Sequence, residues 1–259
     1  ARRAGCFPTA MASAACHAVG MPNSRRFNVA AIPQHVVQRG NDRQACFRQE
    51  DDYLEYLARL AGASRKHGVA IHAYVLMTNH VHLLATPETG DGMSRLMQAV
   101  GSGYVRSYNA KHARTGTLWE GRFFSSLVDG DDYLWQCHRY IELNPVRAGI
   151  ASDPSRYRWS SFARNALGKP DRVVTPHPAY AGLAACEPFR IYRGFFESTL
   201  SEATIVEITD RWRKGRAFAS EERLQHIEAV ASRSPRSRGP GRPRSAAKRE
   251  LTISDLFSQ

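Results

Sequence analysis

The most strongly patterned part of the chain is an apolar run over residues 69–77, which a short polar pair separates from a second run at 80–86. Long runs rich in Val, Ile and Leu are typical of buried strands. The intervening Thr-Asn pair predicts a tight turn, so the two runs are expected to form a hairpin. Side chains two residues apart on a strand point the same way, so His80 and His82 are expected to project together from one face.

Helical periodicity predicts helices on both sides of this hairpin. Apolar residues recur at helical spacing in three segments, at residues 51–67, 93–111 and 131–143. Shorter strands are predicted at residues 32–39 and 123–128. The order strand–helix–strand–strand–helix–strand–helix indicates an α+β fold, with a ferredoxin-like (RRM-like) antiparallel sheet and helices on one face.

The two ends of the chain are less regular than this central part. Residues 1–20 are small and Ala-rich, so we expect a leader outside the fold and a natural start at Met21. The pattern predicts a principal domain over residues 21–165 and a helical appendage over 166–232. Residues 233–259 are predicted to form a basic, largely disordered tail.

The charge of the chain points to a polyanionic partner. The formal net charge is +12 and the isoelectric point is about 9.9. Nucleic acid is the first candidate for such a partner. No apolar run approaches the roughly 18 residues that a membrane-spanning helix needs, so a membrane is set aside. The five cysteines are scattered, which favours a reducing compartment, and we expect a cytoplasmic, nucleoid-associated protein.

The appendage and tail carry two further predictions. Helices are predicted at residues 191–216 and 221–231, and residues 233–249 hold seven basic residues, three prolines and no acidic residue. A Gly-Arg-Pro core in this tail resembles an AT-hook, which would place arginines in a narrow minor groove: Arg238, Arg242 and Arg244. A tail that binds phosphates without sequence preference is an equally good interpretation.

The third predicted helix carries a second set of candidate residues. Gln136, Tyr140 and Asn144 are spaced at i, i+4 and i+8, so they share roughly one face. Tyrosine, with an ordinary pKa of about 10, is a weak nucleophile. It becomes competent when a metal ion neutralises the phosphate that it attacks. His80 and His82 could give such an ion two ligands, and Asn144 a third.

Three segments of the chain resemble bacterial REP-associated tyrosine transposases, where REP stands for repetitive extragenic palindrome. These proteins are single-tyrosine members of the HUH (His–hydrophobe–His) nuclease superfamily. The matching segments are TNHVHLL at residues 78–84, GTLWEGRF at 116–123 and HRYIELNPVRAG at 138–149. The resemblance covers about residues 26–162 well and the later helices more loosely.

The resemblance implies a reaction and a role for each residue. His80 and His82 would bind the metal, Asn144 would match the third ligand, and Tyr140 would be the nucleophile. In the family, tyrosine attacks single-stranded DNA and leaves a 5′-phosphotyrosine and a free 3′-hydroxyl, so that another 3′-hydroxyl can reseal the strand. The family uses Mg²⁺ or Mn²⁺, and its targets are hairpin-forming palindromes. Related enzymes supply the tyrosine helix in cis or across a dimer, so monomer and homodimer both stay open.

Several alternatives remain at this stage. Two imidazoles and an amide are borderline ligands for Mg²⁺, so Mn²⁺ is an equal candidate. Tyr133 competes for the nucleophile's role, although it lies roughly 10 Å back along the helix at about 1.5 Å per residue. Tyr104 and Tyr108 are predicted to be core residues. Arg122, and also Arg139 and Arg147, which flank the tyrosine, are candidate DNA contacts, with structural or plain surface roles as the alternatives.

Two other functions compete with the transposase prediction. The first is a domesticated DNA-binding protein that no longer cuts, which would bind hairpins tightly without cleavage in any metal. The second is a metallohydrolase in which the histidine pair activates water. That enzyme would leave free 5′-phosphates and would tolerate the loss of Tyr140.

Overall fold

The computed structural model describes residues 29–183 and 187–230. The principal part of the fold contains these elements in order: β1 (Gln34–Arg39), η1 (Asn41–Arg43), α1 (Glu50–Lys66), β2 (Val69–Met77), β3 (His80–Pro87), α2 (Gly92–Lys111), β4 (Phe124–Leu127) and α3 (Asp131–Glu142). The elements that follow are α4 (Asn144–Arg147), η2 (Pro154–Arg156), α5 (Phe162–Leu167), α6 (Pro178–Ala181), α7 (Pro188–Gly194), α8 (Glu202–Lys214) and α9 (Glu221–Val230).

The four strands form one antiparallel sheet in the order β2-β3-β1-β4. This order, with α1 between β1 and β2 and α2 between β3 and β4, is the ferredoxin-like arrangement, so the predicted fold class is confirmed. The hairpin of β2 and β3 turns at Thr78 and Asn79, as the sequence predicts. The inner strands β3 and β1 pair with Val37 opposite His82 and Arg39 opposite His80.

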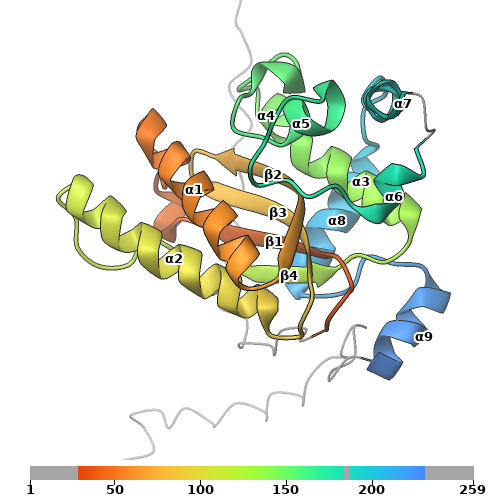
Figure 1. Ribbon diagram of the computed structural model, residues 1–259, viewed down its shortest axis with the longest axis horizontal. Coiled ribbons are helices and arrows are strands. Elements are labelled where there is room, and N and C mark those ends of the chain that lie inside the picture. The colour runs from red at the N-terminus through yellow and green to blue at the C-terminus, as the bar shows by residue number, and fades with distance from the viewer. Residues whose placement is uncertain (1–28, 184–186, 231–259) are drawn as a thin grey trace, which may run out of the picture.

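One face of the sheet is covered by α1 and α2 (Figure 1). The alternation of side chains along each strand sends Val36, Val81 and Leu83 to this face. They pack with apolar and aromatic side chains of both helices, which include Tyr56, Leu60, Leu96, Val100 and Tyr104. This cluster is the largest apolar core among the described residues.

The sequence analysis predicted helices on one face of the sheet only. In the structure, α3 and α8 cover the opposite face as well (Figure 1). Here Val37 and Leu84 pack against Leu134 and Ile141 of α3 and Trp212 of α8. The strand residues that alternate with the first core therefore point toward α3. His80 and His82 belong to this second set.

The predicted long helix at residues 191–216 is wrong, because the structure has two helices there. The first, α7, ends at Gly194, and α8 begins after Ser201, whose side chain accepts a hydrogen bond from the backbone nitrogen of Thr204 at 3.1 Å. Phe196, between the two helices, packs edge to face on Phe162. An N-cap and an aromatic anchor therefore override the helical periodicity at this point.

The chain turns directly after the tyrosine-bearing helix. Helix α3 ends at Glu142, and the short helix α4 starts at Asn144 with Pro145 in its first turn. Proline suits this position because its missing N–H is not needed there. Asn144 therefore opens a new helical turn instead of continuing α3.

Some predictions fall outside the described residues. These are the leader at 1–20, the start at Met21, and the tail with Arg238, Arg242 and Arg244. Within the described ranges, no helix combines the length and the apolar character required to cross a bilayer. The cysteines of the described part, Cys46 and Cys137, are buried free thiols.

Candidate functional site

The histidine pair lies at the start of β3, on the face covered by α3. The ring centroids of His80 and His82 are 5.0 Å apart and their planes are nearly perpendicular, at 81°. His82 is 3% exposed, and His80 is half-buried. The rigid hairpin holds both imidazoles, with Nδ1 of His80 also 2.7 Å from Oδ1 of Asn79. Their common projection is as the sequence predicts.

A third histidine, which the sequence analysis missed, completes this group. His35 of β1 is 1% exposed, and its Nε2 lies 2.9 Å from Nδ1 of His82. The two rings stack with centroids 5.1 Å apart. A lone histidine on a short strand carries no spacing signal, and its position depends on the pairing of β1 with β3. Only that register brings His35 diagonally next to His82.

The tyrosine of α3 meets these histidines. The ring of Tyr140 lies edge-on to both, with centroid distances of 5.7 Å to His82 and 5.6 Å to His35. Its side chain is 4% exposed. The hydroxyl is 3.1 Å from Oγ1 of Thr209 on α8, a hydrogen bond in which either group can donate. Helix α8 therefore covers the phenol, which the sequence did not reveal.

Asn144 lies beside His80. It is buried, and its side chain lies close enough to His80 to raise the pKa of that imidazole. Its Nδ2 atom has no hydrogen-bond partner among the described atoms. A buried amide with an unused end is unusual, because buried polar groups are normally paired. The structure thus brings together His80, His82, Tyr140 and Asn144, the four residues that the sequence proposed for one site.

Burial keeps the three imidazoles uncharged. Burial, and next the nearby charge of Arg147, lower the pKa of His35 from 6.5 to about 3. Burial, followed by Arg39 and Arg147, lowers the pKa of His80 to about 4, although the hydrogen bond with Asn144 raises it. The pKa of His82 is lowered well below its usual value, first by burial and then by His80. Neutral imidazoles are the form that can bind a metal ion.

The predicted arginines differ in their distance from the site. The guanidinium of Arg147 lies 4.2 Å from the centre of the Tyr140 ring, and its Nη1 donates to the carbonyl of Tyr140 at 3.4 Å. Arg139 instead donates to the Ser198 side chain at 3.2 Å. Arg122 is exposed in the loop before β4. Of these three, Arg147 is the one that lies at the histidine–tyrosine site.

Arg39 is a cationic neighbour that the sequence analysis did not identify. It is half-buried at the end of β1, directly opposite His80. Burial lowers the pKa of its guanidinium, while Glu120 raises it and the nearby charges of Arg213 and Arg43 lower it. Its only sequence signal is an even spacing from His35, which puts both on the same face of β1.

The donor set suits a borderline divalent ion. Within the described ranges, no cluster of three or more His, Cys, Asp or Glu residues is placed to hold a metal. The candidate ligands are therefore the two imidazoles of β3 and the amide of Asn144, which already contacts His80. Imidazole suits Mn²⁺ and softer ions better than Mg²⁺, which prefers oxygen ligands. The residues fit a metal site of this kind.

The competing tyrosines point elsewhere. Tyr133 packs on Phe218, with ring centroids 4.5 Å apart. Tyr104 and Tyr108 lie on the other side of the sheet, where they donate to the carbonyls of Cys46 and Ala45 at 2.6 and 2.8 Å. Both are buried, as predicted. Among these tyrosines, Tyr140 is the one that contacts the histidines.

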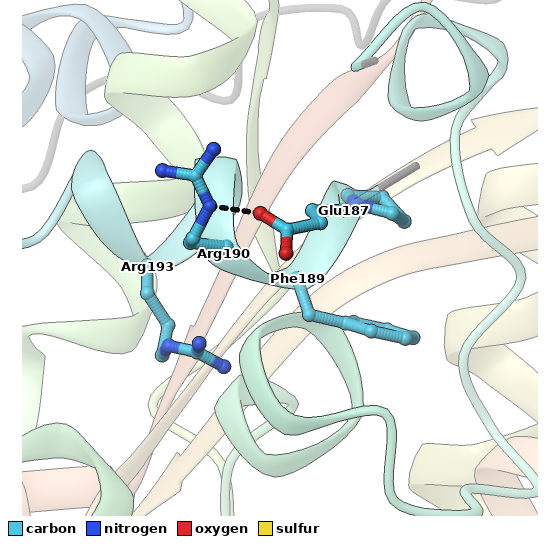
Figure 2. Close-up of a pocket in the computed structure, with 5 residues that line it drawn as sticks. Glu187, Phe189, Arg190 and Arg193 are labelled. Atoms are coloured by element: carbon cyan, nitrogen blue, oxygen red, sulfur yellow. Dashed lines mark hydrogen bonds and ion pairs between the residues drawn. The ribbon is translucent and has the colours of Figure 1, made fainter. Parts of the chain in front are cut away.

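Two surface hollows lie on the C-terminal helices. Figure 2 shows the first, on α7, where Arg190 forms an ion pair with Glu187 and the side chains of Phe189 and Arg193 complete the lining. Arg193 donates to the carbonyl of Ala166 at 2.9 Å, so these charges are engaged within the protein. The second hollow is lined by residues of α8: Ile205, Val206, Thr209, Asp210 and Arg213. It adjoins the candidate site through Thr209.

Comparison with known proteins shows what this part of the chain is similar to. Residues 28–144 match the family model described as transposase, IS200-like, and this range ends on the candidate ligand Asn144. The match spans 117 of the 259 residues, so this part of the chain is similar to IS200-like transposases. No curated protein matches the chain.

The chain is similar to solved structures, and the first of them shares its fold. One is a REP-associated tyrosine transposase bound to a REP hairpin, with 18% identity, a TM-score of 0.50, and coverage of 61% of this chain and 93% of that one. Another is a Deinococcus radiodurans protein provisionally named a transposase, with 22% identity, a TM-score of 0.32, and coverage of 47% and 96%. The resemblance to REP-associated tyrosine transposases is thus confirmed in fold, and the match of residues 28–144 to IS200-like transposases agrees with it.

Proposed function

We propose that the protein is a metal-dependent, single-tyrosine endonuclease and strand transferase that acts on hairpin-forming single-stranded DNA. The observation that supports this function is the edge-on contact of the Tyr140 ring with His82, at 5.7 Å between centroids. A nucleophile and two candidate metal ligands, which lie far apart in the sequence, meet on one face of the sheet. A purely structural tyrosine would have no need of two neighbouring imidazoles that are kept neutral.

The proposed reaction breaks one phosphodiester bond and conserves its energy. The phenol oxygen of Tyr140 attacks phosphorus and loses its proton to solvent, and the bond from phosphorus to the 3′-oxygen breaks. That oxygen leaves as a 3′-hydroxyl after it takes up a proton, and the 5′-phosphate remains on the tyrosine. A divalent ion on His80, His82 and Asn144 would supply charge neutralisation of the attacked phosphate. Attack by a second 3′-hydroxyl reverses the step and joins a new strand.

Two arginines are placed to help with the phosphate. Arg147 covers the ring of Tyr140, and Arg39 stands opposite His80. Guanidinium groups bind phosphate oxygens through paired N–H donors, and they keep their charge at any ordinary pH. We propose that these two guanidinium groups bind the non-bridging oxygens of the scissile phosphate. Arg122 and Arg139 are proposed to contact the DNA backbone farther away.

The described arrangement is a closed form of the site. The hydroxyl of Tyr140 is bonded to Thr209, and the side chain is 4% exposed. A phosphodiester can reach this oxygen only after α8 moves away. Helix α8 therefore acts as a cover over Tyr140, and DNA binding would displace it.

The DNA partner follows from charge and from the solved relative. The net charge of +12 favours a polyanion, and the REP-associated relative is bound to a REP hairpin. Tyr140 meets the histidines of its own chain, which supports a site that is complete in a monomer. A homodimer that exchanges tyrosine helices is the other outcome. The basic tail at 233–259 would add salt-dependent affinity, at the nucleoid of a bacterial cytoplasm.

The test is a covalent adduct. The protein is incubated with an end-labelled hairpin oligonucleotide and Mn²⁺ or Mg²⁺, and a denaturing gel reports protein that carries DNA. We expect an adduct that needs metal and is lost in Tyr140→Phe but kept in Tyr133→Phe. An adduct that survives in Tyr140→Phe would reject this nucleophile. Strand transfer is measured by adding a second, unlabelled strand with a free 3′-hydroxyl and detecting its joining to the labelled DNA.

A second candidate function is a DNA-binding protein that no longer cuts. The hydrogen bond from Tyr140 to Thr209 under α8 favours it, because this contact occupies the nucleophile. It predicts tight hairpin binding and no adduct in any metal, including in a variant whose cover is weakened. A water-activating metallohydrolase would instead release free 5′-phosphates and tolerate Tyr140→Phe.

A further inference from the structure

His35 is the least explained polar residue near the candidate site. It is 1% exposed on an inner strand, a place where an apolar side chain would pack without any desolvation cost. Val37, two residues further along the same face, is the apolar residue expected at such a position. The Nε2 atom of His35 lies 2.9 Å from Nδ1 of His82. Its ring also contacts the edge of Tyr140, at 5.6 Å between centroids.

The contact between His35 and His82 involves a single proton. At 2.9 Å, Nε2 of His35 and Nδ1 of His82 cannot both carry a proton on the line that joins them. One ring nitrogen of the pair must therefore donate and the other accept. If His35 donates to Nδ1 of a neutral His82 ring, the one N–H proton of His82 is on Nε2, which then has no lone pair for an ion. If His82 donates through Nδ1, its Nε2 is free to bind.

We propose that His35 is a positioning residue, which accepts a hydrogen bond from Nδ1 of His82 and so holds His82 in the tautomer whose Nε2 is free for a metal ion. The role of the metal ion in this inference rests on the proposed function. The contacts of His35 with His82 and Tyr140 do not depend on that function. The same side chain packs against Tyr140, so it fixes the ligand and the nucleophile relative to each other. A partner of this kind for the second nitrogen of a ligating histidine raises metal affinity about 10- to 100-fold.

The replacement of His35 can separate shape from hydrogen bonding. In His35→Phe a phenyl ring takes the place of the imidazole and keeps the packing against Tyr140, but the nitrogen acceptor for His82 is lost. In His35→Gln the amide oxygen can take the place of Nε2 as acceptor. A matched control is His72→Phe, at another buried histidine of the sheet, whose partners are the Thr175 carbonyl and the Thr86 hydroxyl, both at 2.8 Å.

The first measurement needs neither metal nor DNA. Long-range ¹H–¹⁵N correlation spectra of metal-free protein labelled on histidine report which ring nitrogen carries the proton. We expect a proton on Nδ1 of His82 in the wild type and in His35→Gln, and a proton on Nε2 in a measurable fraction of His35→Phe. A wild type with the His82 proton on Nε2 would overturn the proposal.

The second measurement is Mn²⁺ binding, followed by the electron paramagnetic resonance of the free ion. We expect binding about 10- to 100-fold weaker in His35→Phe, near-normal binding in His35→Gln, and unchanged affinity in His72→Phe despite its lower thermal stability. Equal affinity in wild type and His35→Phe would refute the positioning role. A wild type that binds no Mn²⁺ and forms no adduct would refute the proposed function, while the spectra of metal-free protein still decide on His35.

Discussion

The two faces of the sheet are built from the same strands, but they bury different kinds of side chain. The face toward α1 and α2 is filled with aliphatic and aromatic side chains. The hydroxyl of Tyr104 donates to a backbone carbonyl there, whereas that of Tyr56 has no hydrogen-bond partner among the described atoms. The face toward α3 and α8 combines an apolar cluster with His35, His82, Tyr140 and Asn144. Several of its polar atoms contact one another, and Nδ2 of Asn144 has no hydrogen-bond partner within the part of the chain that the structure describes.

This difference indicates which face contributes more to the free energy of unfolding. Apolar packing contributes most of the free energy of folding, and the first face carries the larger apolar cluster. The second face carries buried imidazoles and an unpaired amide, which cost stability and are retained at functional sites. We therefore expect substitutions on the first face to change the free energy of unfolding, and substitutions on the second face to change chemistry.

The largest expected effect compares one tyrosine from each face. Tyr140→Phe should abolish the DNA adduct completely, while the lost hydrogen bond to Thr209 lowers the free energy of unfolding by only about 1 kcal/mol. Tyr104→Phe removes a hydrogen bond to the Cys46 carbonyl and should leave the adduct per folded molecule unchanged. Adduct gels and urea denaturation measure both. If Tyr104→Phe also lost the adduct, the two faces would not be separable.

A core truncation on the first face is next in size. Leu60 is fully buried in the α1–α2 core, so Leu60→Ala should lower the free energy of unfolding by about 2–5 kcal/mol. The lost methyl groups leave a cavity far from the histidines, so Mn²⁺ affinity of the folded fraction should stay the same. Urea denaturation gives the first quantity and metal titration at low temperature the second. Weaker metal binding in this variant would contradict the separation of the faces.

The pH dependence of stability tests the buried carboxyl of the tyrosine helix. Burial raises the pKa of Glu142 from 4.5 to about 7, against the hydrogen bonds from Ser161, Asn165 and Tyr192, which lower it. The folded protein thus holds a proton that the unfolded chain has lost. The stabilisation is full below the ordinary pKa and is lost as the pH rises through about 7.

The matching variant is Glu142→Gln, which cannot ionise. Between about pH 5 and about pH 8, the free energy of unfolding of the wild type should fall relative to this variant by about 3 kcal/mol, at about 1.4 kcal/mol per pKa unit. The depressed histidine pKa values act in the opposite direction but are shared by both proteins, so the difference isolates Glu142. Parallel pH profiles would mean that this carboxyl stays ionised.

The smallest expected effect concerns helix α8 as a cover over the Tyr140 hydroxyl. Thr209→Val keeps the shape of the side chain and removes the hydrogen bond to Tyr140, which is worth about 1 kcal/mol. An open form should become about fivefold more populated, and the initial rate of adduct formation should rise accordingly. Thr204→Val on the same helix is the control, because its hydroxyl contacts Ser201 instead. An unchanged rate in Thr209→Val would show that α8 does not limit access to the phenol.

Much of this site could be predicted from the sequence, because its signals are local. The spacing of His80 and His82 on a strand, and of Tyr140 and Asn144 on a helix, fixes which way each pair points. Their meeting was implied by the family resemblance and is visible in the structure. The strands and helices of the ferredoxin-like part follow from hydrophobic periodicity in the same way.

The missed residues depend on long-range geometry. His35 gains its meaning only from the register of β1 against β3, and Arg39 from the same pairing. Thr209 meets Tyr140 because α8 folds back across the sheet, which no local pattern encodes. The break between α7 and α8 was also missed, because Ser201 as an N-cap and the packing of Phe196 outweigh helical periodicity.

The position of β3 has a consequence for the newly made protein. This strand lies inside the sheet, between β2 and β1, and its histidines therefore acquire their final surroundings only when β1 is paired. Tyr140 follows all four strands in the chain. A ribosome-bound or prematurely terminated product that stops before α3 would hold the imidazoles without the phenol. Such incomplete chains would leave the DNA of the cell intact under the reaction proposed above.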